Sequence, residues 1–240
     1  MNARDIRLGK CLSDGWHAIE GNIGLAIGTA ALYLVISSVL GYTGVGTILA
    51  AFPLAGGFTM IYLGLAKRLP ADFPTLFAGF SSVDTWARWL GVGWLLYLYQ
   101  LLVMLIFTVI GGIFIGPGIY LVATHHSSDL GIALIVFGAL VVLIGSAAYM
   151  VRWEFVFMAG AEGATAFDAI RISTELTQGL RWRIFWIMFV LGLINIAGMI
   201  CLFIGVFLTL PITQCAACAL YLDLKKLRAP ITDTPREGAF

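Results

Sequence analysis

The chain has 240 residues, of which 60% are hydrophobic and 11% are charged, and its mean hydropathy is +0.97. Soluble domains are roughly 45–50% apolar and about 25% charged, so this composition excludes an ordinary soluble enzyme, a disordered chain and a nucleic-acid-binding protein. The formal net charge of +1 gives no global preference for an acidic or a basic partner. An integral membrane protein is the class that is left.

Four long stretches of the chain contain no Asp, Glu, Lys or Arg. A helix that crosses a bilayer needs about 20 apolar residues, so the stretches after Glu20 and after Arg183 are each long enough for two crossings. Helices are expected because lipid offers the backbone no hydrogen-bond partner. The sequence therefore predicts an all-α fold, a polytopic bundle of three hairpins, with six transmembrane helices at about 23–40, 47–66, 89–115, 130–151, 184–202 and 204–222.

Glycine and proline mark the predicted turns. Three glycines over 41–46 separate the first two spans, and Gly116-Pro117-Gly118 is expected to end the third. The stretch 116–129 fits a loop, a re-entrant segment or part of a span, and these alternatives stay open. We expect one membrane domain over 1–228 and a disordered cytoplasmic tail over 229–240.

All 14 basic residues fall on one side of the membrane in the six-span arrangement. They are Arg4, Arg7, Lys10, Lys67, Arg68, Arg88, Arg152, Arg171, Arg181, Arg183, Lys225, Lys226, Arg228 and Arg236. Cytoplasmic loops carry the excess of Lys and Arg in multi-pass proteins. The sequence therefore predicts a protein of the bacterial inner membrane with both termini in the cytoplasm.

A short amphipathic segment precedes each predicted hairpin on the cytoplasmic side. The first carries apolar side chains at helical spacing, namely Leu8, Leu12, Trp16 and Ile19. The second begins near Asp72 with Pro74 in its first turn, and in the third Thr165 and Asp168 stand at the spacing of a capping box. Five tryptophans are expected at the membrane interface, namely Trp16, Trp86, Trp89, Trp182 and Trp186. We interpret the segments as helices that lie on the inner leaflet.

The first and last hairpins align with each other along the chain. One constant shift matches Pro53 to Pro211 and Lys67 to Lys225. Four spans separate the two hairpins, so both enter the membrane from the same side. The pattern indicates parallel repeats and not the inverted repeats of many transporters.

Residues 176–185 read Leu-Thr-Gln-Gly-Leu-Arg-Trp-Arg-Ile-Phe. This segment resembles the Leu-Thr-Lys-Gly-Asn-Trp-Trp-Arg-Leu-Phe type of a bacterial superfamily of multi-pass membrane domains, which includes the membrane domain found beside glycerophosphodiester phosphodiesterases. Similar short motifs are Gly15-Trp16, Gly21-Asn22, Phe77-Ala78-Gly79-Phe80, Gly116-Pro117-Gly118-Ile119 and Leu210-Pro211-Ile212-Thr213. The stretch 120–149 is longer than the superfamily pattern. The resemblance implies an inner-membrane helical bundle without known catalytic residues, and the phosphodiesterase barrel is absent.

Three polar residues, Gln100, Asn195 and Gln214, are expected deepest in the spans, and Pro53 and Pro211 interrupt two of them. Such residues either line a pathway through the membrane or pack helices together through interhelical hydrogen bonds and kinks. Packing is the commoner use, and we favour it here.

Three arginines, Arg152, Arg181 and Arg183, are expected at the inner ends of spans. Arginine at this depth extends its guanidinium to the interface, where it anchors the helix or contacts a lipid headgroup. We treat all three as candidates for headgroup contact.

Two further patterns are chemically suggestive. Cys215 and Cys218 share a helix face, and His125, His126 and Asp129 form the polar cluster of the outer loops. Neither pattern completes a metal site, because no second cysteine pair accompanies the first and polar residues are ordinary in a loop. We expect no metal and no cofactor.

The sequence carries no Walker A, His-Glu-x-x-His or Gly-x-Ser-x-Gly motif. A lipid-acting enzyme would require a polar cluster such as Arg152, Glu154 and Glu162 around one pocket. We expect instead a non-catalytic protein with an accessory role in membrane homeostasis, which contacts membrane lipid or a protein partner. The alternative is a transporter, or a transporter subunit, for a small or amphiphilic solute.

Overall fold

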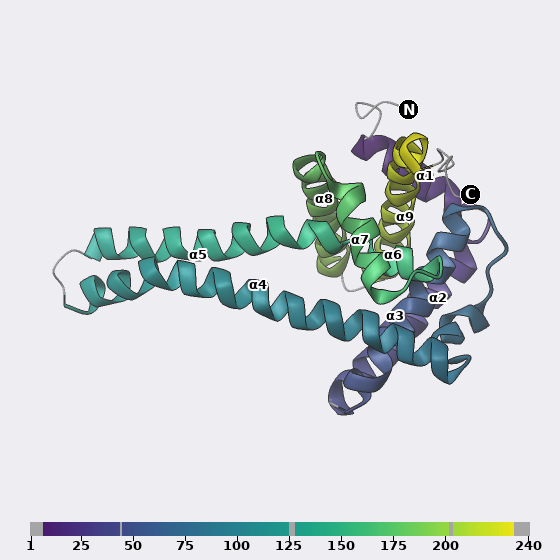
Figure 1. Ribbon diagram of the computed structural model, residues 1–240, viewed down its shortest axis with the longest axis horizontal. Coiled ribbons are helices and arrows are strands. Elements are labelled where there is room, and N and C mark those ends of the chain that lie inside the picture. Colours follow the sequence, from purple (N-terminus) through teal and green to yellow (C-terminus); the bar gives the residue numbers. More distant parts are fainter. Residues whose placement is uncertain (1–6, 44, 125–127, 202–203, 233–240) are drawn as a thin grey trace, which may run out of the picture. The chain divides into compact units, whose positions relative to one another are not determined.

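The computed structural model describes residues 7–43, 45–124, 128–201 and 204–232. Every regular element in these ranges is helical, which confirms the predicted all-α fold (Figure 1). The α-helices are α1 (Leu8–Ile19), α2 (Ile23–Thr43), α3 (Val45–Ala66), α4 (Val83–Ala123), α5 (Ser128–Met150), α6 (Val156–Ala161), α7 (Ala166–Thr177), α8 (Arg181–Ile200) and α9 (Ile204–Thr232). Two 3-10 helices, η2 (Phe73–Phe80) and η3 (Val151–Trp153), complete the described elements.

Six helical segments are long and apolar enough to cross a membrane. They are Ile23–Tyr42, Leu49–Ala66, Val83–Ala123, Ser128–Ala161, Arg181–Ile200 and Gly205–Arg228. Each of the six predicted spans falls on one of these segments. The predicted number of candidate spans is therefore confirmed.

The third helix does not end at Gly116-Pro117-Gly118, and that prediction is wrong. α4 continues through Pro117 to Ala123, so the first part of the 116–129 stretch belongs to a helix of span length. A proline inside a helix removes one N–H donor and crowds the preceding turn. The flanking glycines have no side chains to add to the crowding. Ending the helix here would leave several backbone groups unpaired in an apolar segment instead of one.

The chain divides into two compact units. One comprises Met1–Gly93 and Glu154–Phe240, and the other comprises Trp94–Trp153. The boundary falls inside α4. The expected single domain over 1–228 stays a prediction, because a division by internal contacts says nothing about independent folding.

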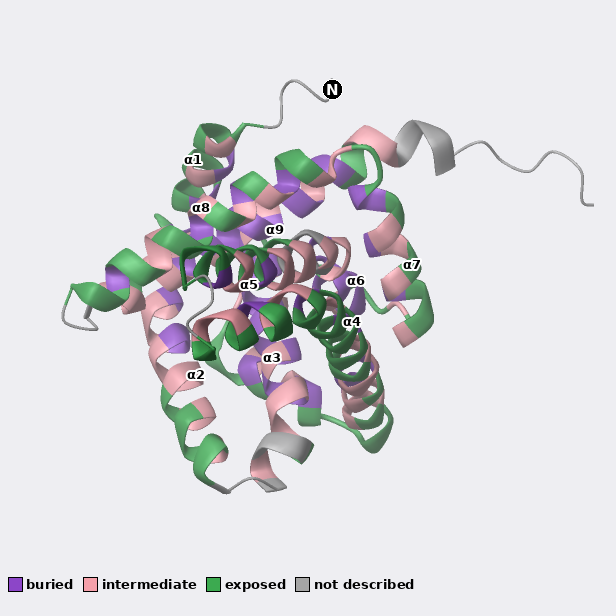
Figure 2. Cartoon of the chain, turned by 90° about the vertical axis from the view of Figure 1, so that its left-hand side faces the viewer, coloured by how far each residue is buried: buried purple, intermediate pink, exposed green. Residues whose placement is uncertain are grey.

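α3 and α9 form the core of the first unit and pack against each other. α2 packs against both of them, and α8 packs against α9. Half of the apolar stretch of α3 and 44% of that of α9 are buried, compared with 17% for α2 and 22% for α8. Figure 2 shows buried residues along both central helices. Their largest fully buried side chains are Leu54, Ile61, Tyr62, Leu65, Leu220 and Tyr221.

α1 packs along α9 through a face that includes Ile19 of the predicted apolar set. Its buried residues are Cys11, Gly15 and Ile19, whereas Trp16 is 40% exposed. Gly15 permits this packing, because a Cβ at this position would lie 2.8 Å from the carbonyl oxygen of Ile212. Backbones approach this closely only where side chains are absent.

η2 packs against α3 through two glycines. A Cβ at Gly57 of α3 would lie 2.0 Å from the Leu76 carbonyl oxygen, and a Cβ at Gly79 of η2 would lie 2.2 Å from the Pro53 carbonyl oxygen. Pro74 occupies the first turn as predicted, but the segment is a 3-10 helix and not an α-helix. The two backbones are therefore in direct contact.

Trp89 does not lie at an aqueous interface, in contrast to the prediction. It is completely buried, its ring stacks on Phe157 at 5.9 Å between centroids, and a Cβ at Gly56 would lie 2.4 Å from it. Its indole N–H has no hydrogen-bond partner within the described residues. The absence of a side chain at Gly56 leaves the space that the indole fills.

One helix begins where the sequence predicted, and another ends later than predicted. Thr165 caps α7, and its hydroxyl accepts a hydrogen bond from the backbone N–H of Asp168. α9 extends to Thr232, so 229–232 is helical and does not belong to the predicted disordered tail. The rest of that tail, 233–240, lies outside the described residues.

The second unit is a hairpin in which α5 lies alongside the later part of α4 (Figure 1). Two glycine pairs form its seam, Gly111 with Gly138 and Gly118 with Gly131, where an added Cβ would lie 2.7–2.8 Å from the opposite carbonyl oxygen. The outward side chains are almost all apolar and exposed, and only 11% of the apolar stretch of α4 is buried. Small residues that bring helices together are typical of packing in lipid.

Candidate functional site

Charged side chains from four parts of the chain gather at one end of the first unit. They come from α1, from the end of α3, from the residue after α6 and from the last turns of α9. We call this group the charged end, and its members are Lys10, Asp14, Lys67, Arg68, Glu162, Asp223, Lys225, Lys226 and Arg228. It contains two pairing clusters and lies beside two pockets.

Glu162 is the centre of the first cluster. Lys67 donates to one of its carboxylate oxygens at 2.6 Å, and Lys225 and Tyr221 donate to the other at 2.8 and 2.6 Å. The side chain is 19% exposed. Burial alone raises the pKa of Glu162, but the hydrogen bonds from Lys225, Lys67 and Tyr221 outweigh it and lower the pKa to about 2. At neutral pH the ionised carboxylate therefore joins the ends of α3 and α6 to α9.

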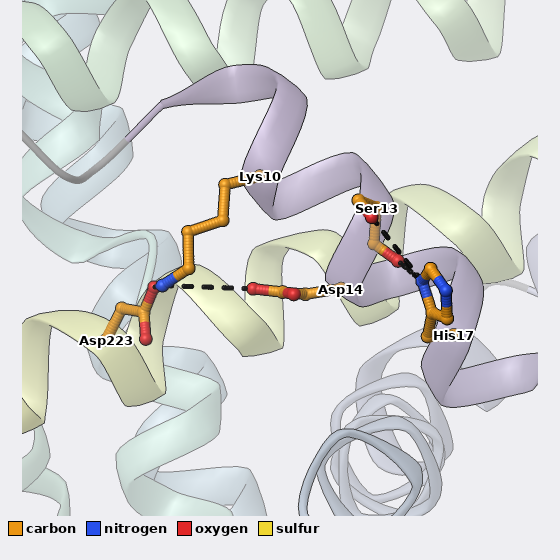
Figure 3. Close-up of polar contacts among 5 residues, drawn as sticks. All are labelled: Lys10, Ser13, Asp14, His17 and Asp223. Carbon is orange, nitrogen blue, oxygen red and sulfur yellow. Dashed lines mark hydrogen bonds and ion pairs between the residues drawn. The ribbon is translucent and has the colours of Figure 1, made fainter.

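Lys10 and Asp223 form the second cluster, which joins α1 to α9 (Figure 3). Their nitrogen and oxygen lie 2.5 Å apart, and Asp14 lies 4.0 Å from the same nitrogen. The hydrogen bond to Asp223 raises the pKa of Lys10 against the opposing effect of burial. Nearby, Nδ1 of His17 lies 2.6 Å from the Ser13 carbonyl oxygen. Because a carbonyl only accepts, Nδ1 carries the proton.

A cavity of about 460 Å³ opens beside the second cluster, and we call it the α1–α9 pocket. Its charged and polar lining consists of Lys10, Ser13, Asp14, His17, Arg68, Asp223 and Lys226. Three alanines, Ala18 of α1, Ala66 of α3 and Ala219 of α9, line it as well. The space exists because each of the three converging helices presents a small side chain there.

A second pocket, of about 680 Å³, lies at the start of α8 and is lined by residues 178–183. It brings together Arg181 and Arg183, two of the predicted headgroup contacts, with Trp182 between them. Nε of Arg181 is buried and has no hydrogen-bond partner within the described residues. Arg228 donates to the Gln178 carbonyl oxygen and ties the end of α9 to this pocket. The first-turn N–H groups of a helix favour an anion, as do the two guanidinium groups.

Arg152, the third predicted headgroup contact, belongs to the other unit. Its guanidinium lies over the Tyr149 ring at 4.5 Å and donates to the Tyr149 hydroxyl at 3.3 Å. Glu162, which the sequence grouped with Arg152 and Glu154, binds Lys67, Lys225 and Tyr221 of the charged end.

Pro53 sits in tightly packed surroundings. It has no N–H, so the carbonyl of Leu49 one turn earlier loses its helical donor. The indole N–H of Trp86 donates to that oxygen at 3.1 Å. Pro211 is buried inside α9, next to the contact with α1. Side chains that pair a freed carbonyl are typical of helix packing in membranes.

The three polar residues have different surroundings. Asn195 of α8 donates to the Thr213 hydroxyl of α9 at 2.9 Å, which is an interhelical hydrogen bond of the expected kind. Gln214 is partly buried on α9, and Gln100 is exposed on α4 in the other unit.

The cysteines are free thiols in the structure. Cys215 and Cys218 are buried in α9, and burial raises the pKa of the Cys11 thiol to about 11. No group of three potential metal ligands occurs among the described residues. His125 and His126, which the sequence singled out, lie outside the described residues.

Sequence reasoning did not identify the Glu162 cluster. One signal was available, because Lys67 and Lys225 are matched by the same shift that matches Pro53 to Pro211. Equivalent positions in two repeats would place both lysines at the same level, where an acid between them would relieve their repulsion. The acid itself could not be found, because Glu162 lies in neither repeat.

The chain matches no protein-family model, no curated protein and no solved structure.

Proposed function

We propose that this is a non-catalytic multi-pass protein of the bacterial inner membrane, whose charged end faces the cytoplasm and contacts anionic lipid in an accessory role in membrane homeostasis. The observation that carries the proposal is the convergence of basic residues from α1, α3, α8 and α9 at one end of the first unit, beside the pocket at the start of α8. Basic residues on one side are the mark of the cytoplasmic face. The resemblance to the superfamily of bacterial membrane domains belongs to the same proposal.

The proposal puts both termini and the short helices α1, η2 and α7 at the cytoplasmic side, since an even number of crossings returns the chain to the side from which it started. A phosphatase reporter that folds only in the periplasm should be inactive when fused after Phe240 and active when fused after Thr124. The two fusions form a matched pair, because one crossing number is even and the other is odd. An active phosphatase at Phe240 would contradict the orientation.

Lipid contact is assigned to the pocket at the start of α8. Two guanidinium groups, a helix N-terminus and the amphipathic Trp182 ring suit a phosphate group at the membrane surface. Each basic residue close to an anionic surface contributes about 1 kcal/mol to lipid binding. The double variant R181A/R183A should therefore bind phosphatidylglycerol about 30-fold more weakly.

The loss of affinity is measured by native mass spectrometry. Phosphatidylglycerol is titrated into the purified protein in zwitterionic detergent, and the lipid-bound fraction is compared between variants. The control is R171A, which removes an exposed arginine of α7 that pairs with Glu175. Equal phosphatidylglycerol retention by the double variant and the wild type would reject this site. The same preparations also serve to find a protein partner by co-purification.

A further inference from the structure

The α1–α9 pocket has the size of a ligand site. Its volume of about 460 Å³ lies within the range of roughly 300–1,000 Å³ that small-molecule sites occupy. Its walls come from α1, the end of α3 and α9, which are far apart in the sequence but pack together in the first unit. We infer that this pocket binds an anionic phosphate ester through Arg68 and Lys226.

The charges around the pocket favour an anion. Lys10 and Asp223 neutralise each other at 2.5 Å, and Asp14 is the one acid that is left. The pocket also contains two basic residues, Arg68 and Lys226, neither of which forms an ion pair within the described residues. Positive charge therefore exceeds negative charge in the lining. Guanidinium and ammonium groups that converge on a cavity are the usual recognition elements for phosphate.

Arg68 occupies a backbone conformation that glycine would adopt with less strain. Its φ is +57°, and among the described residues it is the one non-glycine with a positive φ. It follows the last turn of α3, where its N–H donates to the Leu65 carbonyl and the next N–H, of Leu69, donates to the Gly64 carbonyl. Glycine dominates at this position of a helix end. A left-handed non-glycine residue costs about 1–2 kcal/mol, so an arginine here is explained by its side chain, which lines the pocket.

The other polar groups suit the rest of such a ligand. Ser13 and Asp14 lie on the α1 side of the pocket and can bind hydroxyl or amine groups beside a phosphate. The Lys10–Asp223 pair fixes α1 against α9 and so holds the wall in place (Figure 3). Phosphate esters of this kind occur as lipid headgroups and as soluble metabolites, and the chemistry of recognition is shared.

The test uses the full-length protein and two probes. Glycerol 3-phosphate is titrated by isothermal calorimetry into the protein in detergent, and phosphatidic acid is titrated into the same protein in phosphatidylcholine nanodiscs. The variant is R68G/K226A, which removes both cations and places glycine at the left-handed position. The control is R171A, which removes an exposed arginine of α7 that lines neither pocket.

We expect one or both probes to bind the wild type, with binding at least about tenfold weaker in R68G/K226A and unchanged in R171A. The unfolding temperature of R68G alone should equal or exceed that of the wild type, which separates loss of binding from loss of fold. Binding of glycerol 3-phosphate identifies a soluble ligand, and binding of phosphatidic acid alone identifies a lipid. If neither probe binds, or if R68G/K226A binds as the wild type does, the inference is wrong. Phosphatidylglycerol retention by R181A/R183A tests the proposed lipid site by itself, so failure of one site is distinguishable from failure of the other.

Discussion

Replacement of Glu162 by glutamine is expected to destabilise the protein by about 1–3 kcal/mol, a reduction from the larger effects at fully buried pairs because this side chain is 19% exposed. The amide keeps the shape of the side chain but removes the charge that holds Lys67 and Lys225 together. The two ammonium groups then repel each other, and the Tyr221 hydroxyl donates to a weaker acceptor. Thermal unfolding of the protein in detergent, followed by circular dichroism, measures the change.

The effect of E162Q should depend on pH. The pKa of Glu162 is lowered in the folded protein to about 2, from a usual value of 4.5. A lowered pKa means that the ionised group stabilises the fold above the usual value and that this contribution is lost as the pH falls toward 2. The difference in stability between the wild type and E162Q should therefore be constant at neutral pH and should shrink between about pH 5 and pH 3.

The matched control is E175Q in α7. Glu175 also pairs with a basic residue, Arg171 at 3.2 Å, but both side chains are more than half exposed. Such a surface pair contributes less than about 0.5 kcal/mol, so E175Q should leave the unfolding temperature nearly unchanged. Equal effects of the two substitutions would show that the Glu162 cluster does not stabilise the junction of α3, α6 and α9.

Replacement of Gly57 by alanine is expected to destabilise the protein by about 2–4 kcal/mol. The new methyl group would lie 2.0 Å from the Leu76 carbonyl oxygen and 2.6 Å from its carbon, and both are backbone atoms that cannot rotate away. α3 and η2 would have to separate, which also opens the contact between Gly79 and Pro53. The same detergent unfolding assay measures this loss.

Gly64 provides the control within the same helix. A Cβ at this position would lie 4.0 Å from the Ala71 side chain, which is an ordinary contact. G64A should therefore raise the stability by about 0.5–1 kcal/mol, because alanine favours a helix more than glycine does. If G57A and G64A change the unfolding temperature in the same direction, the close approach of η2 to α3 is wrong.

The sequence predicts the helices well, because they depend on local composition. Long stretches without charge are visible in the chain, and each of them becomes one or two helices. The cap of α7 is equally local, since Thr165 and Asp168 are three residues apart. The end of the third span was misjudged because Pro117 favours a break only where water or side chains can satisfy the freed backbone.

The contacts between distant segments could not be predicted in the same way. Lys67 and Glu162 are 95 residues apart, and no periodicity links them. Trp89 was expected at the membrane interface because tryptophan favours that region. It is buried instead, because Gly56 has no side chain and leaves room for the indole ring. Likewise, Gly15 contacts the α9 backbone at Ile212, which is far away in the sequence, so the face of α1 that packs on α9 could not be predicted locally.

The length of α4 has a physical consequence for its surroundings. A helix of 41 residues extends for about 60 Å, roughly twice the hydrocarbon thickness of an ordinary bilayer. An apolar segment that exceeds the thickness of its membrane inclines steeply, curves, or stretches the neighbouring acyl chains. The stability of this protein is consequently expected to depend on acyl-chain length, with longer lipid tails reducing the mismatch.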